Sequence, residues 1–357
     1  MLAPFSVPVR PDAAALLEVL AGRRRPERVH FLESHLSVPV KEALVARFGL
    51  EAGLSRDDPW FLQRREIVVH RFLGYDAVKV LLGGLDFPVP DAPKAPTESG
   101  DLREWVNERR GPVATWEEFE RYPWPDPAQF DTSVIEWYER NLPEDMGLFG
   151  RSAGSVFAQT AALMGMETLC FALYEQPGLV RAVADRLGRI YVAAARAYAQ
   201  FRRIGFILAG DDMGFRSGTL ISPETLREVF LPWHKRAAQA AHDAGKPYFL
   251  HSCGKVDELM PDLVNDVRID GKHSFEDAIT PVEEFFRAWG ARIAVLGGFD
   301  VDCLCRSDEP AIRRRVREIL AVCQGGRYAL GMGNSVADYV PPENYLIMLD
   351  EGRRWGR

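Results

Sequence analysis

The chain has 357 residues, of which 47% are hydrophobic and 27% are charged, as is typical of a globular protein with a sizeable core. Its formal net charge of −7 gives no field that would attract nucleic acid, and no apolar run approaches the roughly 18 residues of a membrane-spanning helix. The N-terminal residues also lack the pattern of a secretory signal. We therefore expect a cytoplasmic protein that binds neither nucleic acid nor a membrane, and whose five cysteines are thiols or ligands rather than disulfides.

Eight short apolar runs predict β-strands, and amphipathic helical segments follow most of them. The predicted strands are 28–33, 76–82, 146–150, 205–210, 247–251, 267–271, 292–297 and 327–331. Strands that alternate with helices indicate a parallel sheet, and a count of eight indicates closure into a single α/β barrel, a (β/α)8 TIM barrel. An open doubly wound sheet is the alternative fold.

Two segments depart from this alternation. Residues 1–27 predict an N-terminal helical cap. Residues 87–127, rich in proline, glycine and charge, predict a long excursion after the second strand with a hairpin of its own. Within it, Thr115 and Glu118 have the spacing of a capping box at the start of a short helix. The sequence shows no internal repeat, and we predict one domain over residues 1–357.

The reactive groups of such barrels lie on the loops that follow the carboxyl ends of the strands. At these positions the sequence offers carboxylates, imidazoles, a guanidinium, an amide and thiols. In chain order they are Glu33, His35, Asp86, Arg151, Asp211, Asp212, His251, Cys253, His273, Glu276, Asp277, Asp300, Cys303, Cys305 and Asn334. A polar ring of this density indicates a functional site.

The most informative members are His251 and Cys253, which end the apolar run 248–250. Successive side chains of a strand point to opposite faces, so this imidazole and this thiol share one face. Such a pair either ligates Zn²⁺ or forms a nucleophile–base couple. Two ligands are not a complete site, and other loops must supply the rest.

Each polar residue also has a structural alternative. A histidine can sit in the core, a carboxylate can cap the next turn, a thiol can pack in a helix, and an amide can tolerate a left-handed backbone. These alternatives apply, in that order, to His251, to one of Asp211 and Asp212, to Cys303 and Cys305, and to Asn334. The alternative for His273 is a hydrogen bond to Glu276 or Asp277 with no further role.

Several motifs, in order along the chain, carry a resemblance to a known family. They are Gly210-Asp211-Asp212 with Ser222-Pro223-Glu224, His251-Ser252-Cys253-Gly254, Lys272-His273-Ser274-Phe275-Glu276-Asp277, Leu296-Gly297-Gly298-Phe299-Asp300, and Gly333-Asn334-Ser335 with Pro341-Pro342-Glu343-Asn344. Over residues 25–354 the chain resembles the uroporphyrinogen decarboxylase superfamily. That group includes tetrapyrrole decarboxylases and zinc-dependent, corrinoid-linked methyltransferases, and it independently implies the (β/α)8 barrel.

The sequence departs from the decarboxylases of this group at three places. Their arginine-rich loop after the first strand corresponds to residues 33–37, which contain no arginine. Their catalytic aspartate after the second strand falls on Gly83-Gly84, and their histidine near the last strand falls on Asn334. Only Arg151 is placed to meet a substrate carboxylate, so we do not expect uroporphyrinogen to be the substrate.

The methyltransferases of this group hold zinc with a His-x-Cys pair after the fifth strand and a cysteine after the last. His251 and Cys253 match the pair, whereas Asn334 stands at the third position, and a neutral amide is a poor zinc ligand. The candidates to complete the set are Asp211, Asp212, Glu276 and Cys303.

The resemblance therefore implies a zinc-dependent methyltransferase that works with a corrinoid protein or another methyl carrier and a small-molecule thiol or similar nucleophile. In this hypothesis His251, Cys253 and a carboxylate of the Asp211/Asp212 pair hold zinc, which keeps the bound thiol ionised at neutral pH. The remaining predicted roles are orientation of ligands or substrate by His273 and Glu276, and substrate contacts by Glu33, His35, Arg151 and Asn334.

Two other functions fit the same residues. A metal-free lyase would decarboxylate a tetrapyrrole or small organic acid, with Asp211 or Asp212 stabilising a protonated intermediate and His251 or His273 as the acid or base. A non-catalytic protein would bind a tetrapyrrole or corrinoid without turnover. Because barrels of this kind often dimerise, a homodimer is a further expectation.

Overall fold

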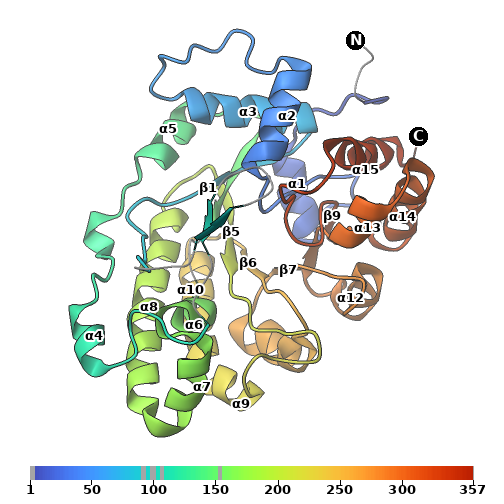
Figure 1. The fold of residues 1–357 in the computed structure, drawn as a ribbon. Coiled ribbons are helices and arrows are strands. Elements are labelled where there is room, and N and C mark those ends of the chain that lie inside the picture. Colours follow the sequence, from blue (N-terminus) through green and yellow to red (C-terminus); the bar gives the residue numbers. More distant parts are fainter. Residues whose placement is uncertain (1–4, 90–93, 97–101, 105–107, 152–154, 357) are drawn as a thin grey trace.

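The computed structural model describes residues 5–89, 94–96, 102–104, 108–151 and 155–356. Its main sheet has seven strands, all parallel and adjacent in chain order. They are β1 (Ala77–Val80), β4 (Gly147–Arg151), β5 (Ile204–Gly210), β6 (Tyr248–His251), β7 (Gly271–His273), β8 (Ala294–Leu296) and β9 (Tyr328–Ala329). The sheet curls like part of a barrel, and helices surround it (Figure 1).

The helices follow the strands in the alternating order that the sequence predicts. The longer ones are α1 (Ala13–Leu20), α2 (Val38–Phe48), α3 (Phe61–Leu73), α4 (Trp116–Arg121), α5 (Ser133–Asn141), α6 (Val156–Met164), α7 (Met166–Glu175), α8 (Pro177–Ala199), α10 (Leu231–His242), α12 (Val282–Trp289), α13 (Val301–Arg306), α14 (Glu309–Cys323) and α15 (Pro342–Arg354). Single turns complete the chain: η1 (Pro127–Gln129), α9 (Pro223–Thr225), η2 (Leu226–Phe230), η3 (Asp257–Leu259), α11 (Met260–Asp262) and η4 (Leu263–Val267).

Local capping explains where several helices begin. The Ser222 hydroxyl accepts the backbone N–H of Thr225 at 3.1 Å, at the start of α9, which leads into α10. The Thr115 hydroxyl accepts the N–H of Glu118 at 3.2 Å, which confirms that Thr115 caps α4. The Glu118 carboxylate reaches back to the N–H of Ala114 at 2.8 Å, one residue before the cap, so orphan N–H groups are bonded on both sides of the helix start.

The enclosed face of the sheet is filled by apolar side chains at alternate strand positions. This interior cluster contains Leu32, Ala77, Phe149, Phe206, Leu208, Phe249, Ala294, Leu296 and Ala329, together with Leu16 and Leu20 of α1. Helix α1 lies at the amino ends of the strands, where the Ala13 N–H donates to the Asp145 carbonyl just before β4 at 3.0 Å. The amino end of the interior is therefore apolar, and polar side chains gather at the carboxyl ends.

The first predicted strand, 28–33, lies beside β9. Phe31 forms a parallel bridge with Leu330, and two backbone hydrogen bonds of 2.8 and 3.0 Å flank it. On the other side, the Arg28 and His30 side chains both pair with Asp76, just before β1. Among the described residues no backbone ladder joins this segment to β1, so a closed eight-stranded barrel remains a prediction.

The sixth predicted strand is displaced along the chain. The sequence predicts it over 267–271, whereas β7 covers Gly271–His273. The π-type turn η4 continues to Val267, and Arg268 leaves it with a left-handed backbone, φ 65°. The apolar run from Val267 therefore packs as the end of a helical turn, and the strand begins only where Gly271 allows close contact with the Phe249 ring.

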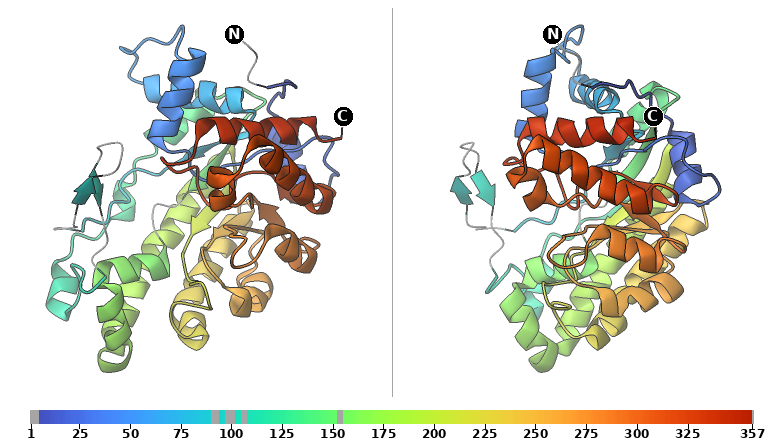
Figure 2. Two further views of the ribbon diagram at one scale, coloured as in Figure 1. Left: turned by 45° about the vertical axis from the view of Figure 1, so that its right-hand side comes forward. Right: turned by 90° about the vertical axis from the view of Figure 1, so that its right-hand side faces the viewer.

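The excursion after β1 contains the expected hairpin. Its described residues pair in antiparallel register as β2 (Lys94–Pro96) and β3 (Leu102–Glu104), and the hairpin stands away from the main sheet in both views of Figure 2. The rest of residues 90–107 lies outside the described residues. In the described part of the chain no single helix is long and apolar enough to cross a membrane; α6 and α7 together pass on length and composition but are bent by 96°.

Candidate metal centre

A layer of basic and imidazole side chains lies next to the interior cluster, on the side of the carboxyl ends of the strands. Ala77, Phe149 and Phe249 belong to that cluster, and side chains two positions along a strand share a face. The next inward positions on β1, β4 and β6 are therefore Lys79, Arg151 and His251, and His273 pairs in register with His251 on β7. The strand pleat thus brings these four side chains to the carboxyl end of the sheet.

His251, Cys253 and Asp212 converge on one point. The Nε2 atom of His251 lies 3.3 Å from the Cys253 Sγ and 3.5 Å from the Asp212 Oδ1, and one ligand atom of each residue falls within 4.8 Å of the others. Tetrahedral ligands at 2.0–2.3 Å from zinc stand about 3.3–3.7 Å apart. The donor set, one imidazole, one thiol and one carboxylate, and its spacing fit a Zn²⁺ ion.

The contact between His273 and the Nδ1 atom of His251 leaves the Nε2 atom of His251 available to bind a metal. The two Nδ1 atoms are 2.6 Å apart and the rings are stacked. Burial lowers the pKa of both imidazoles, that of His273 to about 3, and the nearby Arg151 and Lys272 charges act in the same direction. Both rings are therefore neutral near pH 7, and one proton lies between them. When it is on His251 Nδ1, the Nε2 lone pair faces Cys253 and Asp212, as a metal ligand requires.

The thiol of Cys253 lies among hydrogen-bond donors. Ser274 Oγ donates to its Sγ at 3.4 Å, and Asn334 Nδ2 does so at 3.3 Å. Burial and the Asp212 carboxylate nevertheless raise the pKa of Cys253 to about 12. The protein groups alone therefore keep the thiol protonated, whereas a cation bound between Cys253 and Asp212 would stabilise the thiolate.

The two adjacent aspartates have different surroundings. Asp212 is half-exposed, and its Oδ1 accepts the Cys253 N–H at 2.9 Å. Asp211 is 1% exposed; its carboxylate accepts the N–H groups of Phe157 and Ala158 at the start of α6 and lies 2.8 Å from His234 Nε2. Asp211 therefore does not face the metal centre. It is the one of the two aspartates that acts as a helix cap, but the helix that it caps, α6, follows β4 rather than β5.

Three of the four predicted substrate contacts, those other than Asn334, lie in three different places. Glu33 points outward, where its Oε1 accepts the Met332 N–H at 2.9 Å and the Tyr345 hydroxyl of α15 at 3.1 Å; this corrects its predicted position at the substrate. His35 lies beside Lys79, with its Nδ1 3.1 Å from the Lys79 Nζ. Arg151 faces the enclosed space, with its Nη1 buried and without a hydrogen-bond partner.

The remaining candidate ligands lie away from this centre. Glu276 is exposed in the loop after β7, and the Cys303 Sγ lies on α13, 3.6 Å from the Ser307 hydroxyl. Within the described ranges, the only group of three or more His, Cys, Asp or Glu side chains close enough to share a metal ion is Asp212, His251 and Cys253.

The sequence reasoning missed two lysines. Lys79 is inside a predicted apolar strand, and the period-two alternation from Ala77 would have placed it at the inward polar layer. Lys272 is 4% exposed, and its Nζ donates to the Ser274 carbonyl at 2.7 Å and lies 4.5 Å from the Phe275 ring centroid. It holds together the carbonyls of the turn that carries Ser274, and no spacing in the sequence indicated this role.

The fold and this site define an α/β protein with a candidate metal centre at the carboxyl ends of a curled parallel sheet. Residues 108–355 match the family described as uroporphyrinogen decarboxylase (URO-D), and the chain belongs to that family, as its motifs predict. A methylated-thiol–coenzyme M methyltransferase from Methanosarcina mazei is 27% identical over 189 residues, 53% of this chain and 48% of that protein. The chain thus spans about half the length of this curated relative.

A solved structure of a methyltransferase from Methanosarcina mazei superposes with a TM-score of 0.69 at 16% sequence identity. The match covers 96% of this chain and 98% of the other. It shows that the two proteins share a fold over almost their whole lengths.

Proposed function

We propose that the chain is a zinc-dependent methyltransferase that moves a methyl group between a corrinoid protein, or another methyl carrier, and a small-molecule thiol or similar nucleophile. The observation that carries this proposal is the convergence of His251 Nε2, Cys253 Sγ and Asp212 Oδ1 at zinc-ligand spacing. Family membership supports it, as does the curated relative, which is a methyltransferase for methylated thiols.

His251, Cys253 and Asp212 would hold the zinc ion and leave a position for the substrate. Bound zinc supplies a Lewis acid that lowers the pKa of a coordinated thiol, so that the thiol is a nucleophilic thiolate near pH 7. The surrounding residues hold the ligands: His273 directs the His251 Nε2, and Ser274 donates to the Cys253 sulfur. Asp212 fixes the Cys253 backbone through its N–H.

Asn334 and Glu276 keep their predicted supporting roles in this proposal. Asn334 donates to the Cys253 sulfur, which places its amide at the edge of the site, where it can also bond to the substrate. Glu276 is exposed in the loop after β7 and contributes negative charge near Lys272. Asp211 is no longer a candidate catalytic group in the proposal, because hydrogen bonds inside the core engage both of its oxygens.

A protein methyl carrier would have to approach the carboxyl ends of the strands. Exposed large apolar side chains occur there: Leu81 follows β1, Phe215 follows β5, and Tyr339 follows β9. We call these three residues the apolar rim. Exposed aromatic side chains around a polar site are typical of protein-binding surfaces, and they support a carrier that docks over the opening.

Metal analysis of a Cys253→Ser variant tests the proposal. We expect one zinc per chain in the wild-type protein purified with zinc, and loss of that zinc in the variant, because a neutral hydroxyl replaces the thiolate ligand. Cys323→Ser, which changes a buried thiol of α14, is the matched control and should retain zinc. Stoichiometric zinc in Cys253→Ser would refute the metal centre. An active protein without any transition metal would favour the alternative, a carboxy-lyase.

A further inference from the structure

A buried lysine joins the two turns that form the candidate metal centre. Lys272 is 4% exposed, and its Nζ atom donates to three backbone carbonyls, those of Ser252 at 3.3 Å, His273 at 3.4 Å and Ser274 at 2.7 Å. Ser252 lies between the two proposed metal ligands of the turn after β6, whereas the other two carbonyls belong to the end of β7 and the turn that follows it. One ammonium group therefore holds neighbouring turns together.

No carboxylate neutralises this ammonium group. Within the described ranges, no acidic side chain lies within ion-pair distance of Lys272; its Nζ instead lies 4.5 Å from the Phe275 ring centroid and 5.4 Å from that of Phe285, and aromatic faces attract a cation. Burial lowers the pKa of Lys272 to about 8, so the group still carries its positive charge near pH 7. Burying an unpaired charge costs free energy, and the rings and carbonyls offset part of that cost.

The turn that Lys272 holds has an uncommon backbone conformation. Ser274 has a φ of 84°, in the left-handed region that residues other than glycine rarely adopt. The lysine bond to its carbonyl secures this conformation, in which the Ser274 hydroxyl donates to the Cys253 Sγ at 3.4 Å. The preceding residue, His273, contacts the Nδ1 of His251. The turn after β7 therefore supports both the thiol and the imidazole of the candidate centre.

The charges of the candidate centre leave an excess when a substrate thiol joins it. A Zn²⁺ ion held by a neutral imidazole, the Cys253 thiolate and the Asp212 carboxylate has no net charge, so a thiolate in the open position adds one negative charge. Burial and the Asp212 carboxylate dominate the pKa of Cys253, but the Lys272 charge lowers it. The ammonium is therefore close enough to stabilise negative charge on sulfur at this centre.

We propose that Lys272 is a positioning residue that acts as the buried counter-cation of the metal centre: it joins the two turns, and its charge stabilises the thiolate form of the substrate. This inference rests on the proposed function and adds a residue to it. A neutral donor in the same place could bond to the carbonyls but could not offset the additional negative charge. The lysine should therefore favour an anionic ligand over a neutral one at the open position of the metal.

Titration of the metal-loaded protein at pH 7 with two small ligands tests this inference. The probes are 2-mercaptoethanol, which binds a metal as its thiolate, and imidazole, which binds as a neutral group. Calorimetry of the zinc-loaded protein measures both affinities, and the sulfur-to-metal charge-transfer absorption of the cobalt-loaded protein shows whether sulfur is bound. For Lys272→Met we expect retained zinc, about tenfold or weaker binding of 2-mercaptoethanol, and unchanged binding of imidazole.

Two further variants separate the charge of Lys272 from its hydrogen bonds. Lys272→Gln keeps an N–H donor for the carbonyls but carries no charge, so it should show the same selective loss; it also supplies the comparison if Lys272→Met does not fold. Lys255→Met is the matched control, because Lys255 also follows β6 but its side chain is 44% exposed, where water and salt screen its charge. This control should bind both ligands as the wild-type protein does.

The outcomes distinguish this inference from the proposed function. Wild-type affinity for 2-mercaptoethanol in the Lys272 variants, or an equal loss of both ligands, would refute the counter-cation and leave the metal centre intact. Loss of zinc from Lys272→Gln would also refute it, since the lysine would then act through the fold of the turns alone. A wild-type protein that binds no metal would overturn the proposed function and this inference with it.

Discussion

Glu33 illustrates how one carboxyl group can be mistaken for a substrate contact. It follows the first predicted strand, yet it lies on the outer side of that segment, 5% exposed, and bonds to Tyr345 of α15. Burial raises its pKa well above the usual value, and the Met332 N–H only partly offsets this effect. Its Oε2 has no hydrogen-bond partner. The folded protein therefore keeps this group protonated where the unfolded chain would ionise it.

This raised pKa makes stability depend on pH in a defined direction. Below about pH 4.5 both states are protonated at Glu33; above it the unfolded state loses the proton first, so stability falls as pH rises. We expect Glu33→Gln, whose amide oxygen can still accept the Met332 N–H, to remove this fall, so that its stability relative to wild type is greater at pH 8 than at pH 4.5. Urea unfolding at pH 4.5 and pH 8 measures the difference, and parallel pH slopes for the two proteins would contradict it.

At the scale of elements, Asp211 joins three of them. Its carboxylate caps α6 and meets His234 of α10, and the His234 Nδ1 in turn lies 2.9 Å from the Tyr248 hydroxyl of β6. All of these groups are buried. The network fixes the end of β5 against the helices, and so it fixes the position of the adjacent Asp212 in the candidate metal centre.

Exchanging the two aspartates for asparagine should separate stability from metal binding. In Asp211→Asn the amide N–H₂ would face an N–H donor of α6 or His234, and we expect the free energy of unfolding to fall by about 3 kcal/mol with zinc still bound. In Asp212→Asn, a half-exposed change, we expect stability within about 0.5 kcal/mol of wild type and zinc affinity at least tenfold weaker. Denaturant unfolding and zinc competition titration test this pair, and the reverse pattern would refute the assigned roles.

The predicted elements succeeded where local signals were unambiguous. Apolar runs bounded by turns identified β5 and β6, and the capping-box spacing of Thr115 and Glu118 marked the start of α4. The apolar run after Val267 gave a wrong strand, because the same residues fit the end of a helical turn and only the left-handed Arg268 distinguishes the two. The backbone conformation set the boundaries of these strands and turns, and the apolar periodicity of the sequence does not predict that conformation.

The candidate site was also predictable only in part. His251 and Cys253 share a face by strand alternation alone, and they lie within ligand spacing as expected. The choice between Asp211 and Asp212 depended on contacts with α6 and α10, which are more than 20 residues away along the chain on either side. Strand alternation from Ala77 marks Lys79 as an inward residue, but its contact with His35 joins segments 44 residues apart along the chain, which the alternation does not reveal.

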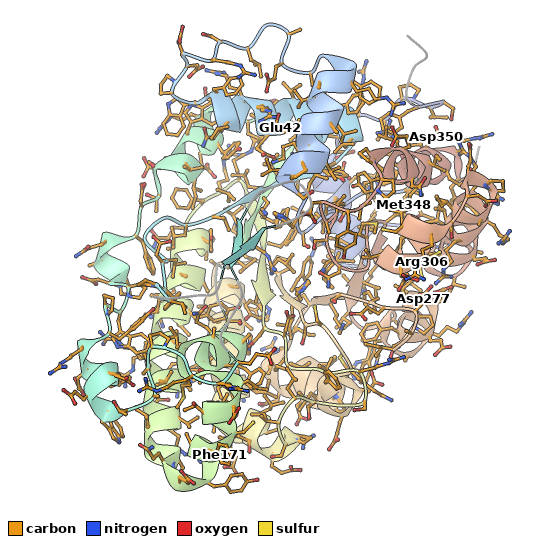
Figure 3. All side chains as sticks on the ribbon, viewed as in Figure 1. Glu42, Phe171, Asp277, Arg306, Met348 and Asp350 are labelled. Atoms are coloured by element: carbon orange, nitrogen blue, oxygen red, sulfur yellow. The ribbon has the colours of Figure 1, made fainter. Side chains whose placement is uncertain are left out.

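At the scale of the whole molecule, the open question of the proposed function is how a methyl carrier reaches the metal centre. The apolar interior and α1 close the amino end of the sheet, so access is from the carboxyl ends, where the apolar rim of Leu81, Phe215 and Tyr339 lies. Phe171 is as exposed as Phe215, 59% against 60%, and lies on α7 at the lower edge of the molecule in Figure 3; α7 precedes α8, which leads back to the amino end of β5, so Phe171 is also on the carboxyl side of the sheet.

Replacing the rim aromatics should therefore impair a protein carrier and spare a small one. For Phe215→Ser combined with Tyr339→Ser we expect about a tenfold or greater rise in KM for a methylated corrinoid protein, because each buried aromatic anchor contributes about 1–2 kcal/mol to an interface. Methyl transfer from free methylcobalamin should be unchanged, since that donor needs no docking surface. Equal loss with both donors would place the rim residues in the metal site itself, and no loss with either would exclude carrier docking at this face.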